Sequence, residues 1–128
     1  MTLKEEFIKL GYTEEDYEII RNNYAVNQIK DETLIKKLKD NFAFLLKMGY
    51  TKEEVIKMTK SSPQIYGYSI ENMKQKIEDM IALGYTKEEV IKMTKSSPTI
   101  YNLSIETIKR KIEDIISLGY TKEEVIKM

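Results

Sequence analysis

The residues of this sequence that could carry chemistry are basic side chains that recur at a spacing of 35 positions. Lysines repeat at this spacing as Lys57/Lys92/Lys127, Lys60/Lys95, Lys74/Lys109 and Lys76/Lys111. Arg110 stands where the preceding copy has Gln75. Ammonium and guanidinium groups bind phosphate oxygens, and a guanidinium can form two parallel hydrogen bonds to one phosphate. The candidate contacts to a nucleic-acid backbone are Lys57, Lys60, Lys74, Lys76, Lys92, Lys95, Lys109, Arg110 and Lys111.

The composition excludes most catalytic chemistry. The 128 residues include no His and no Cys, which are the ligands of nearly all zinc, copper, haem and iron–sulfur sites. Ser-His-Asp and Cys-His nucleophiles are excluded for the same reason. The acidic residues fall in helix caps and at solvent-facing positions, so no pair of carboxylates stands out as catalytic. We expect a non-enzymatic protein that uses no metal and no cofactor.

The charges balance, with 21 Lys+Arg against 21 Asp+Glu. A net charge of zero argues against a uniformly basic surface. Within each helix, however, the signs hold fixed positions, because Lys57 and Lys60 lie opposite the apolar Val55 and Met58 at 100° per residue. Stacked repeats would then present a basic stripe and an acidic stripe. Each repeat would face roughly five phosphates of a duplex with about two lysines, so we expect weak, salt-sensitive binding.

These side chains are positioned by an internal repeat. The ten residues Gly49–Met58 recur unchanged at Gly84–Met93 and at Gly119–Met128. Residues 49–83 and 84–118 are identical at 27 of 35 positions. We divide the single repeat domain into an initial half-helix (1–10), a diverged cap repeat (11–48), two repeats (49–83 and 84–118) and a terminal half-repeat (119–128).

Each repeat carries its own helix signals. Thr51 and Glu54 form a capping-box pattern that begins a short helix, and Pro63 ends that helix near Ser62. A turn or 3₁₀ segment follows, and Ser69 then caps a longer helix that runs to about Leu83. Gly84 suits the left-handed residue that terminates it.

A two-helix unit of this length cannot bury its apolar stripe alone, so neighbouring units must stack. The long helix carries that stripe at Ile70, Met73, Ile77, Met80 and Ile81. The predicted fold is all-α, an α-solenoid of units of about 35 residues, each with two antiparallel helices and a short 3₁₀ turn. The terminal copy leaves Val125 and Met128 without a following partner. Either its helix packs back on the previous unit or the array continues.

The residues resemble a known family. A proline before a few apolar residues, a long helix, a Leu-Gly-aromatic turn and a Thr-x-Glu-Glu helix are similar to the repeat of mitochondrial transcription termination factors, the mTERF repeat. Pro63 and Pro98 match the proline, and Leu83-Gly84-Tyr85 and Leu118-Gly119-Tyr120 match the turn. The resemblance implies units stacked in a left-handed superhelix with a concave basic surface. It further implies binding of double-stranded DNA or RNA in the regulation of gene expression.

Other interpretations remain open. The chain is short and neutral, whereas members of that family are usually longer and basic. A neutral solenoid also serves as a protein-interaction scaffold whose groove holds a peptide or a helix, and the terminal repeat could support self-association. Tyr50, Tyr66, Tyr85, Tyr101 and Tyr120 could stack on bases, but their places in turns favour packing. With no signal peptide, transit peptide or membrane span visible, we expect a cytoplasmic location and no membrane partner.

Overall fold

The computed structural model describes residues 1–127, so the expectation for Met128 lies outside the described residues. Across them the protein is all-α, as predicted, with 76% helix. The first half contains α1 (Leu3–Leu10), α2 (Glu14–Arg21), α3 (Asp31–Met48), α4 (Lys52–Ser61) and the 3₁₀ helix η1 (Pro63–Gly67). The second half contains α5 (Ile70–Ala82), α6 (Lys87–Ser96), η2 (Pro98–Asn102), α7 (Ile105–Ser117) and α8 (Lys122–Lys127).

The predicted helix signals are confirmed at atomic detail. Thr51 accepts a hydrogen bond from the Glu54 N–H at 3.2 Å, and the Glu54 carboxylate accepts one from the Thr51 N–H at 2.8 Å. The same reciprocal pair caps α6 at Thr86. Proline starts both 3₁₀ helices. Glycine ends the long helices with positive φ, +119° at Gly49 and +107° at Gly84, a conformation that costs side-chain-bearing residues free energy.

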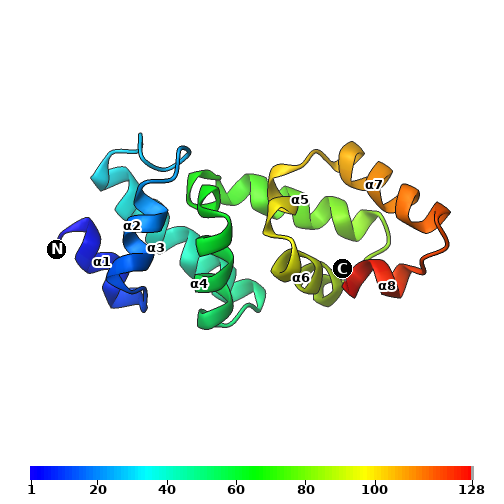
Figure 1. The fold of residues 1–128 in the computed structure, drawn as a ribbon, viewed down its shortest axis with the longest axis horizontal. Helices are drawn as coiled ribbons and strands as arrows, with labels where there is room; N and C mark the ends of the chain where they lie inside the picture. The colour runs from blue at the N-terminus through cyan, green and yellow to red at the C-terminus, as the bar shows by residue number, and fades with distance from the viewer. Residues whose placement is uncertain (128) are drawn as a thin grey trace. The chain divides into compact units, whose positions relative to one another are not determined.

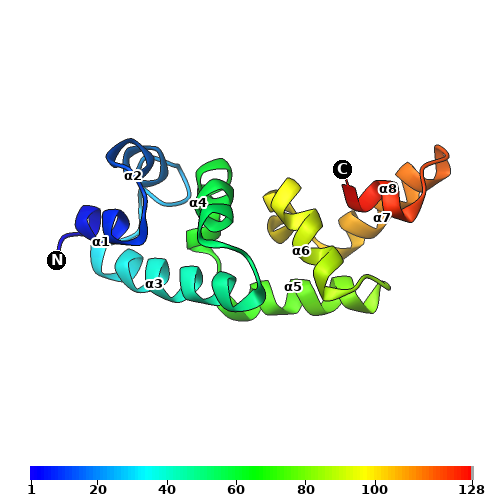
Figure 2. The same cartoon turned by 90° about the horizontal axis from the view of Figure 1, so that it is seen from below.

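The chain forms two compact units, which we call unit 1 (Met1–Ile70) and unit 2 (Glu71 onward). In unit 1, α1, α2 and α4 lie on one side of α3, as Figure 2 shows. The core of unit 1 includes Phe7, Leu38 and Leu45, none of which is exposed to solvent. Their burial is the main stabilising contribution of this unit, at roughly 1.5–3 kcal/mol for each side chain.

A buried hydrogen-bonded cluster joins three elements of unit 1. The Tyr12 hydroxyl lies 2.7 Å from Thr59 Oγ1 and also contacts the Tyr66 hydroxyl. Thr59 Oγ1 donates to the Val55 carbonyl at 2.8 Å in turn. Burial raises the pKa of Tyr12 to about 12. Because every hydroxyl has a partner, the cluster fixes the packing of η1 against α4 and the α1–α2 turn without an unsatisfied polar group.

The diverged cap repeat replaces the proline turn with a loop that Arg21 holds. Its guanidinium donates to the carbonyls of Val26 at 2.8 Å and Ile29 at 2.9 Å, and to the Asp31 carboxylate at 2.9 Å. Val26, a residue of this loop, has a fully buried side chain. The Arg21 side chain therefore fixes the conformation of this loop, whereas in the later repeat Pro63 begins a 3₁₀ helix at the corresponding place.

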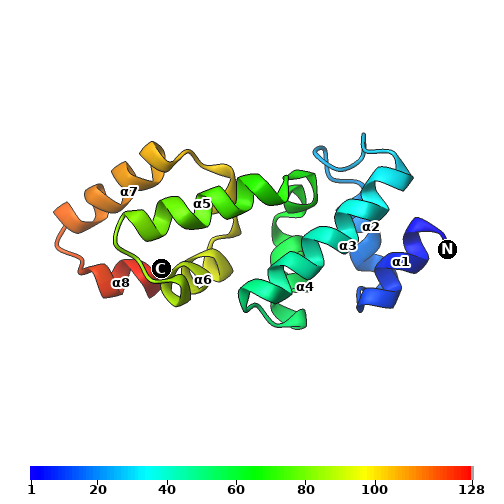
Figure 3. The ribbon, with the colours of Figure 1, turned by 180° about the vertical axis from the view of Figure 1, so that it is seen from behind.

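In unit 2 the short helices α6 and α8 pack on each other, and α7 packs on α8. Helix α6 contacts both α8 and η2, and Figure 1 shows α6 and α8 side by side. Helices α7 and α8 contact each other across the Gly119 turn, as Figure 3 shows from behind. Val125 and Ile126 of α8 are buried. Helix α8 therefore packs on α6, as α4 packs on α2 in unit 1.

Two packing predictions are wrong. Ile81 was expected in the buried stripe of the long helix, yet it is 42% exposed, because Met73, Ile77 and Met80 alone face the core. Tyr120 is 44% exposed. The other four repeat tyrosines, Tyr50, Tyr66, Tyr85 and Tyr101, are buried as the packing interpretation predicted.

Candidate nucleic-acid interface

In unit 1 the candidate residues lie on α4 beside a hollow of about 500 Å³ between α2 and α4. The hollow is lined by Ile19, Glu53, Ile56, Lys57, Lys60 and Ser61. Lys57 is exposed, and within the described part of the chain its ammonium has no ion pair, although Glu53 lies one helical turn away. Lys57 is therefore free to meet an anion from solvent.

Lys60 has an internal partner that the sequence did not reveal. Its Nζ lies 3.1 Å from Asp16 Oδ1, and the Asp16 side chain is only 9% exposed. Burial alone would raise the pKa of Asp16, but the Thr13 N–H and the Lys60 ammonium outweigh it and hold that pKa below its usual 3.8. Lys60 thus neutralises a buried carboxylate in the capping box of α2, and this internal ion pair competes with any contact to a ligand.

In unit 2 the lysines at two positions of the repeat are exposed to solvent. Lys92 on α6 and Lys127 on α8 occupy the same repeat position on helices that contact each other, and both are exposed. Lys74 on α5 and Lys109 on α7 are likewise exposed at one shared position. Lys95 is exposed near the end of α6.

Lys76 is a structural residue. Its ammonium donates a hydrogen bond to the Leu103 carbonyl at the end of η2. In unit 1, Asn41 occupies the same position 35 residues earlier and donates to the Tyr68 carbonyl at 3.1 Å and the Ile65 carbonyl at 3.0 Å. The position therefore joins each long helix to the 3₁₀ turn that packs on it.

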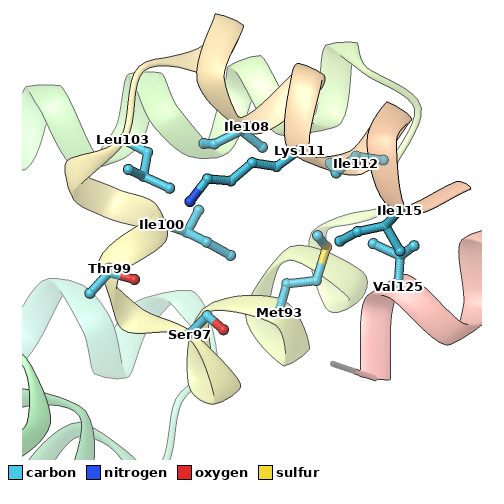
Figure 4. Close-up of a pocket in the computed structure, with 10 residues that line it drawn as sticks. All are labelled: Met93, Ser97, Thr99, Ile100, Leu103, Ile108, Lys111, Ile112, Ile115 and Val125. Carbon is cyan, nitrogen blue, oxygen red and sulfur yellow. The ribbon is translucent and has the colours of Figure 1, made fainter. Parts of the chain in front are cut away.

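Arg110 and Lys111 differ in their surroundings although they are adjacent. Both are exposed, but Arg110 lies on the side of α7 opposite the buried Ile108, at about 200° from it around the helix. Lys111 instead extends across an apolar pocket (Figure 4). The two adjacent basic residues therefore face different parts of the surface of unit 2.

Sequence reasoning missed Lys122, the second residue of the last Thr-Lys-Glu-Glu box. Its Nζ donates to the Gly84 carbonyl at 2.7 Å and lies 4.8 Å from the centre of the Tyr85 ring. A cation over an aromatic face stabilises by about 0.5–1 kcal/mol at an exposed site. The same lysine recurs as Lys52, Lys87 and Lys122, but all ten residues around it recur as well, so the sequence did not single it out.

Other ligand classes have little support in the described residues. Among residues 1–127 no group of three or more acidic side chains is placed to hold a metal ion. None of the helices described there is long and apolar enough to cross a bilayer. The surface does carry exposed lysines, among them Lys57, Lys92 and Lys127, on a scaffold of repeated helices.

A comparison with family profiles identifies that scaffold. The profile described as mTERF matches residues 4–128. The chain belongs to the mTERF family. No curated protein sequence matches it. Membership in the mTERF family accounts for the shared proline turns and Leu-Gly-aromatic turns, and nucleic-acid binding by helical repeats is the activity associated with that family.

Proposed function

We propose that this mTERF-family protein binds the phosphate backbone of double-stranded DNA or RNA and acts in the regulation of gene expression without catalysis. The observation that carries the proposal is the exposed lysine at one repeat position of α4, α6 and α8, namely Lys57, Lys92 and Lys127. In unit 2, Lys92 and Lys127 lie on helices that contact each other, so both ammonium groups are available to a backbone that carries a charge about every 1.7 Å.

The contacts above divide the nine candidates into three groups. Lys60 and Lys76 serve internal partners, so we propose them as residues that hold the scaffold. We propose Lys57, Lys74, Lys92 and Lys109 as direct phosphate contacts, with Lys95 and Arg110 as further contacts at the edge of the surface. Lys111 forms the third group, because its side chain extends across the apolar pocket of unit 2, and we propose no phosphate contact for it.

Because each repeat offers only about two lysines to a duplex, binding should be weak and should depend strongly on salt. The chain is titrated into labelled duplex DNA, duplex RNA and the corresponding single strands, and fluorescence anisotropy is followed at several salt concentrations. We expect log affinity for the duplexes to fall linearly with log salt, by about 0.9 for each phosphate contacted.

The variant Lys57→Met/Lys92→Met removes one exposed lysine from each unit and should weaken duplex binding without changing thermal stability. Lys36→Met/Lys47→Met is the matched control, since it removes the same charge from exposed positions of α3. Equal losses for both variants would reduce the effect to net charge. Absence of binding to all four polymers at low salt would refute the proposal.

A further inference from the structure

An exposed carboxylate accompanies the exposed lysine of α4, α6 and α8. In each of these helices a glutamate stands four residues before the lysine, so the two side chains lie on the same face of the helix, one turn apart. All six residues are exposed. The pairs are Glu53/Lys57, Glu88/Lys92 and Glu123/Lys127. A ligand that binds these lysines must therefore also suit a neighbouring carboxylate.

The carboxylates of these three glutamates are available to a ligand. Within residues 1–127 none of them forms an ion pair. The capping box of each helix uses the next residue of the chain instead, at Glu54, Glu89 and Glu124. A negative charge in the first turn does favour the helix dipole, but that interaction leaves the oxygens of the carboxylate open to solvent.

In unit 1 the glutamate and the lysine line one hollow. Glu53 and Lys57 border the hollow of about 500 Å³ beside α4, together with the apolar Ile19 and Ile56. Ile19 is 46% exposed. In a nucleic acid each phosphate is joined directly to a sugar, so a phosphate held by Lys57 brings a sugar to this hollow. The carbon atoms of that sugar suit the two isoleucines, and its polar edge lies within the range of Glu53.

The carboxylate distinguishes the two sugars. An ionised carboxylate accepts hydrogen bonds and donates none. The backbone of DNA offers only acceptor oxygens, so a glutamate beside it adds repulsion from the phosphates and no hydrogen bond. Ribose adds a 2′-hydroxyl, which can donate, and duplex RNA displays these hydroxyls in its wide, shallow minor groove. A carboxylate one turn from an ammonium group therefore matches the hydroxyl and the phosphate of RNA.

We propose that the protein selects duplex RNA over duplex DNA, and that the glutamates which precede its short-helix lysines accept hydrogen bonds from ribose 2′-hydroxyls. This inference rests on the proposed function, because it concerns the ligand of the same lysines. In unit 2, α6 and α8 contact each other, so the pairs Glu88/Lys92 and Glu123/Lys127 are both available to one RNA segment.

The test compares three labelled duplexes of one sequence at one salt concentration. They are duplex RNA, duplex DNA, and duplex RNA with 2′-O-methyl groups, which keeps the 2′-oxygens but removes their hydrogens. Fluorescence anisotropy measures the affinity of the full chain for each duplex. We expect RNA to bind about tenfold more tightly than DNA, as two or more hydrogen bonds predict. The 2′-O-methyl duplex should bind more weakly than unmodified RNA.

The variant Glu53→Met/Glu88→Met removes one carboxylate from each unit. It should bind DNA more tightly, because repulsion is lost, and should gain less for RNA, so that the ratio of the two affinities approaches one. Glu32→Met/Glu106→Met is the matched control, since it removes the same charge from exposed residues in the first turns of α3 and α7. It should keep the ratio of the parent. Circular dichroism checks that both variants are folded.

The outcomes separate this inference from the proposed function. Equal, salt-dependent binding of duplex RNA and duplex DNA by the parent would overturn the inference and leave the proposed function standing. A preference for RNA that Glu53→Met/Glu88→Met leaves unchanged would also overturn it. The same holds for a preference for DNA that depends on these glutamates, because they would then accept from cytosine amino groups in the major groove. Absence of binding to every duplex would overturn both.

Discussion

At the scale of single residues, two neighbouring lysines of one helix have different roles. Lys57 meets only solvent, whereas Lys60, three positions later on the same helix, pairs with the buried Asp16 carboxylate. The distinction lies in what the neighbouring helix places opposite each ammonium, and α2 places an acid opposite Lys60 alone. Charge counts along the sequence cannot separate such residues, but stability measurements can.

Lys60→Met is expected to lower the free energy of unfolding by about 1 kcal/mol, because it leaves a nearly buried carboxylate without its cation while Lys60 itself is partly solvated. Urea titration monitored by circular dichroism measures the change. Lys57→Met, the matched variant on the same helix, should leave the free energy of unfolding within about 0.5 kcal/mol of the parent. Equal effects would contradict the assignment of Lys60 as structural.

The ion pair between Lys60 and Asp16 also predicts that the stability of the fold falls at acid pH. The pKa of Asp16 is held below 3.8 in the folded state, so its stabilisation is complete above about pH 4 and is lost as pH falls through the lowered pKa. Without Lys60 the pKa of Asp16 rises, and the loss of stability begins at a higher pH. Acid titration of the two variants, followed by circular dichroism, should therefore show earlier unfolding for Lys60→Met than for Lys57→Met.

Tyr12 predicts the opposite dependence, at alkaline pH. Its folded pKa is raised to about 12 from the ordinary 10, so its contribution is complete below pH 10 and disappears as pH rises through 12. At neutral pH, Tyr12→Phe should cost about 1 kcal/mol through the lost hydrogen bonds. The gap between parent and variant should narrow between pH 10 and 12 in urea titrations. A gap that widens would contradict the buried, neutral hydroxyl.

At the scale of elements, the helix boundaries follow from local signals and their partners do not. Capping boxes, prolines and glycines act within a few residues, so the ends of α4, η1 and α6 could be predicted from the sequence. The partners of Asn41 and Lys76 could not, because each contact spans 27 residues and depends on how two repeats pack. The loop 22–30 has no proline, and nothing in its pattern indicated the role of Arg21.

That role gives an element-scale prediction. Arg21→Met should lower the free energy of unfolding by about 2 kcal/mol, because two part-buried carbonyls of the loop and Asp31 lose a charged donor. Amide hydrogen exchange should quicken in residues 23–30 more than in α5 or α6. Arg110→Met, at an exposed position, is the control and should leave exchange unchanged. Uniform acceleration along the chain would argue against local ordering by Arg21.

At the scale of the whole molecule, zero net charge is compatible with binding a polyanion. Acids of the repeat are used in capping boxes, as Glu54 and Glu89 are, whereas Lys57 and Lys92 are exposed without such a role. The candidate lysines therefore differ in whether they contact an internal partner, as Lys60 and Lys76 do. The proposed phosphate contacts are exposed lysines, Lys57 and Lys92 on the short helices and Lys74 and Lys109 on the long ones.

The salt dependence of duplex binding tests this account most directly. The slope of log affinity against log salt is measured for the parent chain, Lys57→Met/Lys92→Met and Lys36→Met/Lys47→Met. If each exposed lysine of the short helices contacts one phosphate, the first variant should have a slope shallower by about 1.8, at 0.9 per contact. The second should keep the parent slope. An unchanged slope for Lys57→Met/Lys92→Met would contradict the proposed interface.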